Sequence, residues 1–162
     1  MINGSNVSKL ERQIKQGSNM DVFYTSALFI FVAMTVMFFV ALAMCDNSIV
    51  DIFYGLAYLV GCWGAYSEFG QAHPRQLLIL GLLTVWGLRL AIHLFFRKKG
   101  HGEDFRYAQW RREWGKTFVW RSFLQVFMLQ GLVVLLVATP VLLVIAAPGG
   151  PLNWLVYLGI FI

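Results

Sequence analysis

Long apolar runs with almost no charged residues are the feature that most constrains this chain. Four of them have about the 20 residues that a helix needs to cross a hydrocarbon core of roughly 30 Å; they cover 22–45, 49–67, 77–96 and 118–147. The runs are apolar on every face, which does not match the alternating strands of a transmembrane barrel. The sequence therefore predicts an all-α fold, a polytopic transmembrane helix bundle whose helices satisfy their own backbone polar groups in lipid.

The composition agrees with a membrane protein, because 59% of the residues are hydrophobic and only 13% are charged, against roughly 45–50% apolar residues in ordinary soluble domains. A fifth apolar run begins at Leu152 and reaches the last residue, Ile162. At about 1.5 Å per residue it covers only half of a bilayer. We therefore expect four full spans and a truncated fifth, in an N-terminal fragment with weak or no activity by itself.

Two predicted regions divide the chain: a polar leader, 1–20, and a transmembrane helical domain, 21–162. The leader lacks the apolar segment of a signal peptide. Met20 stands directly before the first span, so both Met1 and Met20 are candidate start sites. Cys45 and Cys62 have no metal-ligand spacing and are interpreted as buried apolar residues, with no disulfide framework and no metal site.

The segment 97–116, RKKGHGEDFRYAQWRREWGK, carries seven of the 13 Lys and Arg residues. Loops rich in Lys and Arg stay on the cytoplasmic side. The segment is therefore predicted to be cytoplasmic, with the 46–48 turn on the same side and the N-terminus outside. Lys9, Arg12 and Lys15 of the leader conflict with this orientation, unless the chain starts at Met20.

Three ionisable residues of the third run, Arg89, His93 and Arg97, follow one another at helical spacing and share one face. An ionisable group at membrane depth costs roughly 2.5–3.5 kcal/mol on insertion scales, so each needs an explanation. One interpretation is an arginine that extends to the headgroups; the other is a functional stripe. The sequence leaves both open.

Asp51 lies one turn inside the second run, with Tyr54 and Tyr58 on the same face. The carboxylate could be a helix cap favoured by the macrodipole. Alternatively, the acid and its neighbouring phenols could donate or relay a proton to a bound apolar substrate. Asp51 and Tyr54 are our candidate catalytic residues.

Within the charged segment, Asp104 is a good N-cap and Gly115 a good C-cap, which predicts a short helix over 105–114. This helix could lie in the membrane interface, with its aromatic face in the headgroups and its cations on anionic lipid. The second interpretation is a polyanion site, in which Gly100 and Gly102 let backbone N–H groups approach a phosphate. The cations available to bind that phosphate are Arg97, Lys98, Lys99 and Arg106.

Three segments, NSIVDIFYGL, TVWGLRLAIHLFFRKKGHGEDFRYAQWRREWG and VWRSFLQVFMLQG, resemble in order and spacing the bacterial branch of the steroid 5-alpha-reductase family. The resemblance runs from about Asn47 to the C-terminus. It implies an enzyme of the bacterial inner membrane that transfers hydride from NADPH to the activated C=C bond of an apolar, steroid-like or other lipid enone. The expected partners are that substrate, membrane lipids and the remainder of a longer protein, with no nucleic acid.

By position, the resemblance implies that Arg89, His93 and Arg97 contact NADPH. Glu103, Asp104, Arg106 and Tyr107 match the loop motif that follows and are also assigned to the cofactor. Asp51 lies about where the family places the carboxylate that hydrogen-bonds the substrate ketone. The family's later Arg-His-Pro-Asn-Tyr type motif does not occur in this chain.

Two other functions compete with the reductase. A membrane methyltransferase of the isoprenylcysteine or phospholipid type is distantly similar to the family. From another class comes a non-catalytic membrane protein whose basic loop binds anionic lipid. The 97–116 segment favours the reductase.

Overall fold

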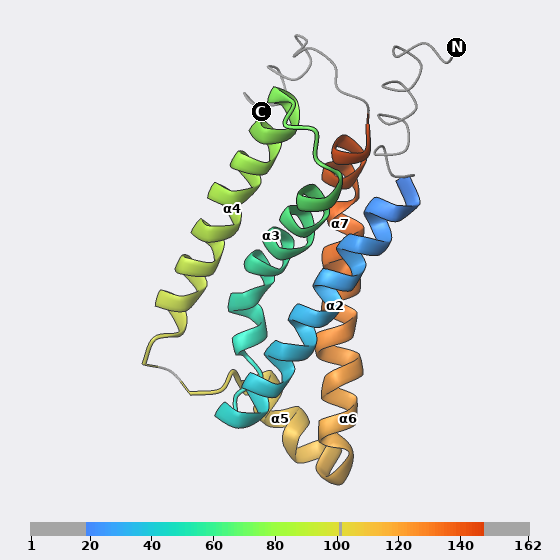
Figure 1. The fold of residues 1–162 in the computed structure, drawn as a ribbon. Coiled ribbons are helices and arrows are strands. Elements are labelled where there is room, and N and C mark those ends of the chain that lie inside the picture. The colour runs from blue at the N-terminus through green and yellow to red at the C-terminus, as the bar shows by residue number, and fades with distance from the viewer. Residues whose placement is uncertain (1–18, 101, 148–162) are drawn as a thin grey trace, which may run out of the picture.

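The computed structural model describes residues 19–100 and 102–147, and these residues form helices joined by short connections, without strands (Figure 1). Three long helices come first: α2 (Asn19–Met44), α3 (Ile49–Phe69) and α4 (Pro74–Lys98). A further helical stretch follows, composed of α5 (Phe105–Trp114), the 3-10 turn η1 (Gly115–Thr117), α6 (Phe118–Ser122), the π-helical segment η2 (Phe123–Met128) and α7 (Leu129–Ala146).

Four helical stretches are long and apolar enough to cross a membrane: Asn19–Met44, Ile49–Phe69, Pro74–Lys98 and Phe105–Ala146. This confirms the predicted all-helical architecture with four spans. The first three predicted runs begin and end within three residues of the ends of α2, α3 and α4. The fourth, 118–147, matches the part of the last stretch that is formed by α6, η2 and α7. The predicted fifth span, and most of the leader, lie outside the described residues.

The helix ends follow the signals in the sequence. Asp104 caps α5 by accepting a hydrogen bond from the backbone N–H of Arg106 at 3.0 Å. Gly115 ends the helix with φ of 46°, a left-handed conformation that glycine adopts without strain. The predicted helix over 105–114 is thus confirmed. Pro140 lies inside α7, and the departure from α geometry occurs earlier, in η2.

The core lies between α2, α3 and α7, and α4 packs mainly against α3 on the outer side of this group (Figure 1). Phe38 of α2 is buried and meets Phe127 and Phe123 edge-to-face, with ring centroids 5.3 and 5.0 Å apart. Such edge-to-face contacts fix the rotation of α2 against η2.

Helices α3 and α4 touch backbone to backbone at Gly55 and Gly87. A Cβ atom built on Gly55 would stand 2.6 Å from the carbonyl oxygen of Gly87, and one on Gly87 would stand 2.8 Å from that of Gly55. The indole N–H of Trp63 adds a hydrogen bond to the Thr84 hydroxyl at 3.0 Å. Small residues that let helices approach, with polar side chains across the contact, are typical of helix packing in membranes.

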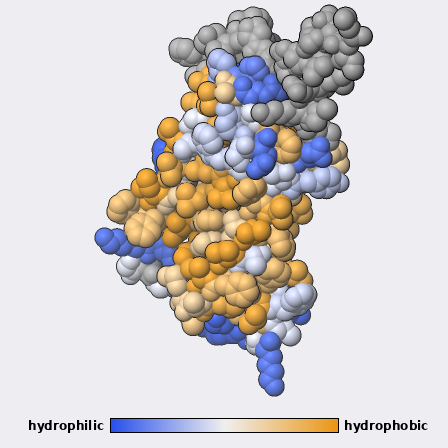
Figure 2. All heavy atoms as spheres, in the orientation of Figure 1, coloured by the Kyte–Doolittle hydropathy of each residue, from blue (hydrophilic) through white to orange (hydrophobic). Residues whose placement is uncertain are grey.

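The outward surface of the bundle is apolar. Figure 2 shows hydrophobic residues over the middle of the molecule and hydrophilic ones toward both ends. Many large apolar side chains are exposed, among them Tyr24, Phe39, Val85, Phe96, Leu136 and Val137. A soluble protein rarely exposes so much contiguous apolar surface, so the chain is an integral membrane protein.

Candidate functional site

The charged residues meet at one end of the bundle, where the turn after α2 and the loop after α4 lie side by side (Figure 1). Since α2, α3 and α4 run antiparallel in succession, the end of α2, the start of α3 and the end of α4 come together there. The sequence predicted this common side for the 46–48 turn and the charged segment. The structure shows that the turn and the charged segment also contact each other directly.

Glu103 joins the two connections. Its Oε1 accepts the backbone N–H of Asn47 at 3.0 Å, and its carboxylate binds the Arg111 guanidinium through two bonds of 2.9 and 3.2 Å. The Glu103 side chain is only 13% exposed. Two-pronged pairs of this kind hold geometry more firmly than a single ion pair. Glu103 therefore ties the turn before α3 to helix α5.

Asp46 and Lys98 form a second link between the same connections, through an ion pair of Nζ with Oδ2. Asp46 Oδ1 also accepts the backbone N–H of Ser48 at 3.0 Å. Burial acts to raise the pKa of the Asp46 carboxyl, but the hydrogen bonds from Lys98 and Ser48 outweigh it and lower that pKa. Asp46 therefore stays ionised, and it holds the Lys98 ammonium.

Asp51 is the carboxylate nearest to the centre of the site. Its Oδ1 accepts a hydrogen bond from the Tyr107 hydroxyl at 3.0 Å, and its Oδ2 accepts one from Arg106 Nη2 at 3.3 Å. Arg106 also binds both oxygens of Asp104, at 3.0 and 3.2 Å. These hydrogen bonds hold the pKa of the Asp104 carboxyl below its ordinary value. Helices α3 and α5 thus meet through an acid, a phenol and a guanidinium.

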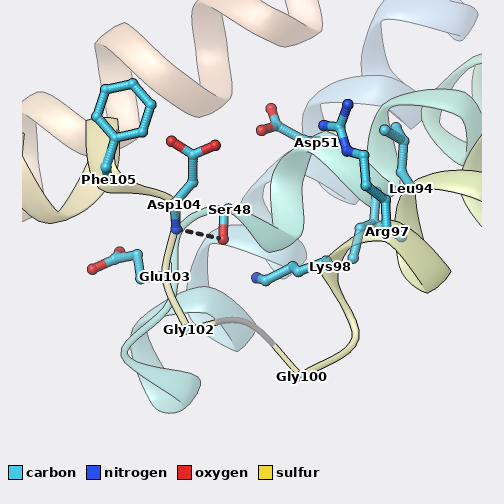
Figure 3. Close-up of a pocket in the computed structure, with 11 residues that line it drawn as sticks. Ser48, Asp51, Leu94, Arg97, Lys98, Gly100, Gly102, Glu103, Asp104 and Phe105 are labelled. Carbon is cyan, nitrogen blue, oxygen red and sulfur yellow. Dashed lines mark hydrogen bonds between the residues drawn. The ribbon is translucent and has the colours of Figure 1, made fainter.

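A cavity of about 590 Å³ opens beside this cluster (Figure 3). Figure 3 shows Arg97, Lys98 and Asp51 on one side of the cavity and the loop residues Gly102, Glu103 and Asp104 on the other. Arg97 forms no ion pair with a carboxylate of the described residues. The complete lining consists of Ser48, Asp51, Ile52, Leu94, Arg97, Lys98, Gly100, Gly102, Glu103, Asp104 and Phe105.

A family model described as "Protein of unknown function (DUF1295)" matches residues 37–162. The chain belongs to the DUF1295 family. None of the curated proteins matches the chain, and none of the solved structures matches it. All residues of the cavity lie within the segment that matches the DUF1295 model.

The DUF1295 site brings together six of the nine residues that the sequence singled out. Asp51, Arg97, Glu103 and Asp104 line the cavity, and Arg106 and Tyr107 contact Asp51. Glu103 and Asp104 already have cationic partners within the chain. The resemblance assigns both residues to the cofactor, but here their carboxylates bind arginines of the chain itself.

Tyr54 differs from its predicted place. Its hydroxyl lies 3.0 Å from that of Tyr58, one turn further along α3, and the phenol on Asp51 is that of Tyr107. Helical spacing put Tyr54 on the face of Asp51, but the long phenol extends along the helix to the next tyrosine. The acid and phenol pair exists, with a partner 56 positions away in the sequence.

Arg89 and His93 lie two turns and one turn before Arg97 on α4 and do not line the cavity beside Asp51. They line a second cavity of about 260 Å³ with Trp86 and Leu90. Both side chains are exposed, and neither has a carboxylate partner among the described residues. The predicted stripe therefore divides between two cavities, with Arg97 in the larger one.

Sequence reasoning missed Ser48, Leu94 and Phe105 as lining residues, and Arg111 as the partner of Glu103. Ser48 could have been found, because Ser-x-x-Asp before an apolar run is a helix-start signal. No local pattern identifies Arg111, since its pairing with Glu103 depends on how the loop turns into α5. The described residues contain no group of three or more metal-binding side chains.

Proposed function

We propose that this DUF1295 protein is a membrane oxidoreductase that transfers hydride from NADPH to the activated C=C bond of an apolar enone. The observation that carries the proposal is a single cavity lined both by Arg97, which has no described carboxylate partner, and by Asp51, whose carboxylate accepts the hydrogen bond of the Tyr107 phenol behind it. Arg97 fits a phosphate group, and Tyr107 with Asp51 fits a carbonyl oxygen. The resemblance to the steroid 5-alpha-reductase family supports the same assignment.

The residues present fit part of a dinucleotide. Arg97 offers a two-pronged contact to a phosphate, and Gly102 has open space where a side chain would project. The three lining carboxylates would repel a polyanion if they were bare. Each one is instead satisfied within the chain: Asp51 by Tyr107 and Arg106, Asp104 by Arg106, and Glu103 by Arg111. Asp51 and Asp104 share the guanidinium of Arg106, so Arg106 and Arg111 together balance two of the three negative charges. Arg97 is the lining arginine without a described ion-pair partner, and it is the group that would meet a phosphate.

When bound, NADPH would supply a hydride to the β-carbon of the enone. As the hydride adds, the C=C electron pair shifts to the bond between the α-carbon and the carbonyl carbon, and the π pair of the carbonyl group moves onto its oxygen. Arg106 presents N–H donors beside Asp51 that can stabilise that negative charge. The Tyr107 O–H donates to Asp51 here, and in the reaction it would turn from Asp51 to the carbonyl oxygen. Asp51 orients the phenol, and a proton from solvent water completes the α-carbon. The cofactor carries the chemistry, and the chain supplies position and charge.

We also propose that the end of the bundle with this cavity faces the cytoplasm and that α5 lies in the membrane interface. The seven cations of 97–116 support the orientation. Phe105 and Trp120 are exposed by 75% and 66%, and the cations Arg112 and Lys116, which stand between them in the sequence, are exposed as well. Aromatic side chains with adjacent cations are typical of an interfacial helix. An apolar substrate would reach the cavity from the bilayer, and NADPH would reach it from the cytoplasm.

The same exposed surface favours a second candidate function, the binding of anionic lipid by the basic segment. In this alternative Arg97 neutralises a lipid headgroup. The two functions differ in whether binding requires anionic lipid. NADPH bound in the cavity would persist in a neutral bilayer, and a lipid site would need anionic lipid.

Titration of the full chain with NADPH, in nanodiscs of a zwitterionic lipid, tests the proposal. We expect saturable binding that Arg97→Gln weakens by about tenfold or more, because a hydrogen bond to a charged group contributes roughly 1.5–3 kcal/mol. Arg75→Gln is the matched control, since Arg75 lies at the other end of α4, away from the cavity. Equal affinities in the two variants would contradict the cofactor site.

Hydride transfer needs its own measurement. NADPH deuterated at the reactive carbon should leave deuterium at the β-carbon of an enone in single-turnover mixtures, which detects weak activity. Tyr107→Phe should lower this transfer by about 100-fold or more, the size of the loss of one oxyanion donor. NADPH binding without transfer to any enone would overturn the reductase assignment, and binding of anionic lipid alone would support the second candidate.

A further inference from the structure

Glu103 is the residue whose observed contacts differ most from the role that the resemblance gives it. Its Oε1 accepts two hydrogen bonds, from the Asn47 backbone and from Arg111 Nη2, and its Oε2 accepts a third from Arg111 Nε. A carboxylate satisfied in this way has little capacity left for a ligand, although it lines the cavity.

We propose that Glu103 is a positioning residue, which sets the Tyr107 and Asp51 pair by fixing helix α5 against the start of α3. The inference rests on the proposed function for its catalytic meaning. Its structural content, that one carboxylate controls a hydrogen bond elsewhere in the site, stands independently of NADPH.

The contacts of Glu103 reach both partners of the pair. Asn47, which donates its N–H to Glu103, stands four residues before Asp51, at the turn that leads into α3. Arg111 stands four residues after Tyr107 and therefore on the same face of α5. Glu103 thus binds a residue four positions before Asp51 on one side and a residue one helical turn after Tyr107 on the other.

Arg111 extends this control to the next helix. Its guanidinium lies over the ring of Phe118, 4.2 Å from the centroid, and Phe118 is buried at the start of α6. A second contact between the same connections, from the Asp104 backbone N–H to the Ser48 hydroxyl, is long at 3.4 Å. Apart from the contacts of Asp51 with Tyr107 and Arg106, the Glu103 carboxylate is therefore the firmer of the two contacts that hold the turn before α3 to the start of α5.

The geometry to be held is narrow. The Tyr107 hydroxyl lies 3.0 Å from Asp51 Oδ1, and a proton-handling pair works within about 2.6–3.2 Å. A displacement of α5 by about 1 Å would break the bond, and misplacement of this size costs on the order of 100-fold in rate.

The test reads the Tyr107 ring directly, without any ligand. The full chain is labelled with ¹³C at the tyrosine ζ-carbon, and the signal of Tyr107 is assigned by its loss in Tyr107→Phe. We expect Glu103→Gln to move this signal toward its position in Asp51→Asn, where the acceptor charge is gone. Glu113→Gln is the matched control, since Glu113 is an exposed carboxylate of the same helix, bonded to Gln109; it should leave the signal in place.

Arg111→Lys gives a second measurement from the other side of the clamp. It keeps the positive charge but loses the two-pronged geometry, and it leaves the Glu103 carboxylate in the cavity. A positioning role predicts that it moves the Tyr107 signal as Glu103→Gln does. This variant also decides the matter if Glu103→Gln does not fold.

NADPH titration of the same variants separates positioning from ligand contact. Positioning predicts that Glu103→Gln keeps NADPH affinity within about twofold and lowers hydride transfer. An unmoved Tyr107 signal in Glu103→Gln and Arg111→Lys overturns the inference, whatever the affinity. If no variant binds NADPH, wild type included, the proposed function fails, and the Tyr107 signal still decides the role of Glu103.

Discussion

Substitution of Gly55 by alanine tests the contact between α3 and α4, which places Arg97 beside Asp51. The added Cβ would stand 2.6 Å from the Gly87 carbonyl oxygen, where ordinary contact begins at 3.4 Å. The helices would have to separate by about 0.8 Å at this point, the difference of the two distances. The obstructing atom belongs to backbone within a helix, so no side-chain rotation can relieve the overlap.

The expected cost follows from two opposing effects. Overpacking of this kind destabilises by about 1–3 kcal/mol, whereas replacing glycine by alanine inside a helix stabilises by about 1 kcal/mol. Gly81→Ala in α4 isolates the second effect, because nothing lies within 4 Å of its added Cβ. The two variants carry the same chemical change, so Gly55→Ala should be less stable than Gly81→Ala by about 1–3 kcal/mol.

Thermal unfolding in detergent, followed by far-UV circular dichroism and tryptophan fluorescence, provides the assay. A difference of 1 kcal/mol corresponds to about 2–4 °C in Tm for a chain of this size. Gly81→Ala should match or exceed wild type, and Gly55→Ala should unfold at lower temperature. Equal stability of the two alanine variants would refute the close approach of α3 and α4.

Three further predictions concern the ends of the bundle. The pKa of Asp104 in the folded chain lies below its ordinary 3.8 because Arg106 binds the carboxylate, so its contribution to stability is complete above about pH 4 and is lost as pH falls through the lowered value. Asp104→Asn, which keeps the cap, should therefore lower Tm slightly at neutral pH, and its Tm should meet that of wild type as pH falls through this acidic range; a difference in Tm that does not change with pH would contradict the ion pair. Gln76→Leu should destabilise the chain by about 1–3 kcal/mol, measured by denaturant titration, since the buried amide bonds the Gln71 N–H and two carbonyls of α7; an unchanged midpoint would contradict its role. In a cysteine-free background, Lys99→Cys should react with an impermeant maleimide only from the cytoplasmic side and Gln71→Cys only from the opposite side, and the reverse pattern would overturn the orientation.

The helical architecture followed from the sequence because lipid leaves few alternatives. A run of about 20 apolar residues in a bilayer must form its backbone hydrogen bonds internally, so the four spans were defined by composition alone. The α5 helix was found in the same way, through Asp104 and Gly115 at its ends, because a cap acts within one turn of chain.

The pairings within the site were harder to predict. Helical spacing placed Tyr54 beside Asp51, and the structure instead gives Asp51 the phenol of Tyr107. Spacing reports which residues share a face, but it does not report which other helix covers that face. The stripe of Arg89, His93 and Arg97 shows the same limit, since its residues share a face of α4 and line two different cavities.

By itself, the sequence determined that this chain is a membrane bundle of helices with its charge gathered in one segment, because apolar length and local caps act on neighbouring residues. Only the tertiary structure decided what that charge does. Glu103 and Asp104, which a motif assigns to a ligand, bind Arg111 and Arg106 of the chain itself, and Arg97 lines the cavity without a carboxylate partner among the described residues. The ion pairs between distant segments, Lys98 with Asp46 and Arg106 with Asp51, form because the ends of α2, α3 and α4 meet at one end of the bundle (Figure 1), and that meeting is set by packing in three dimensions.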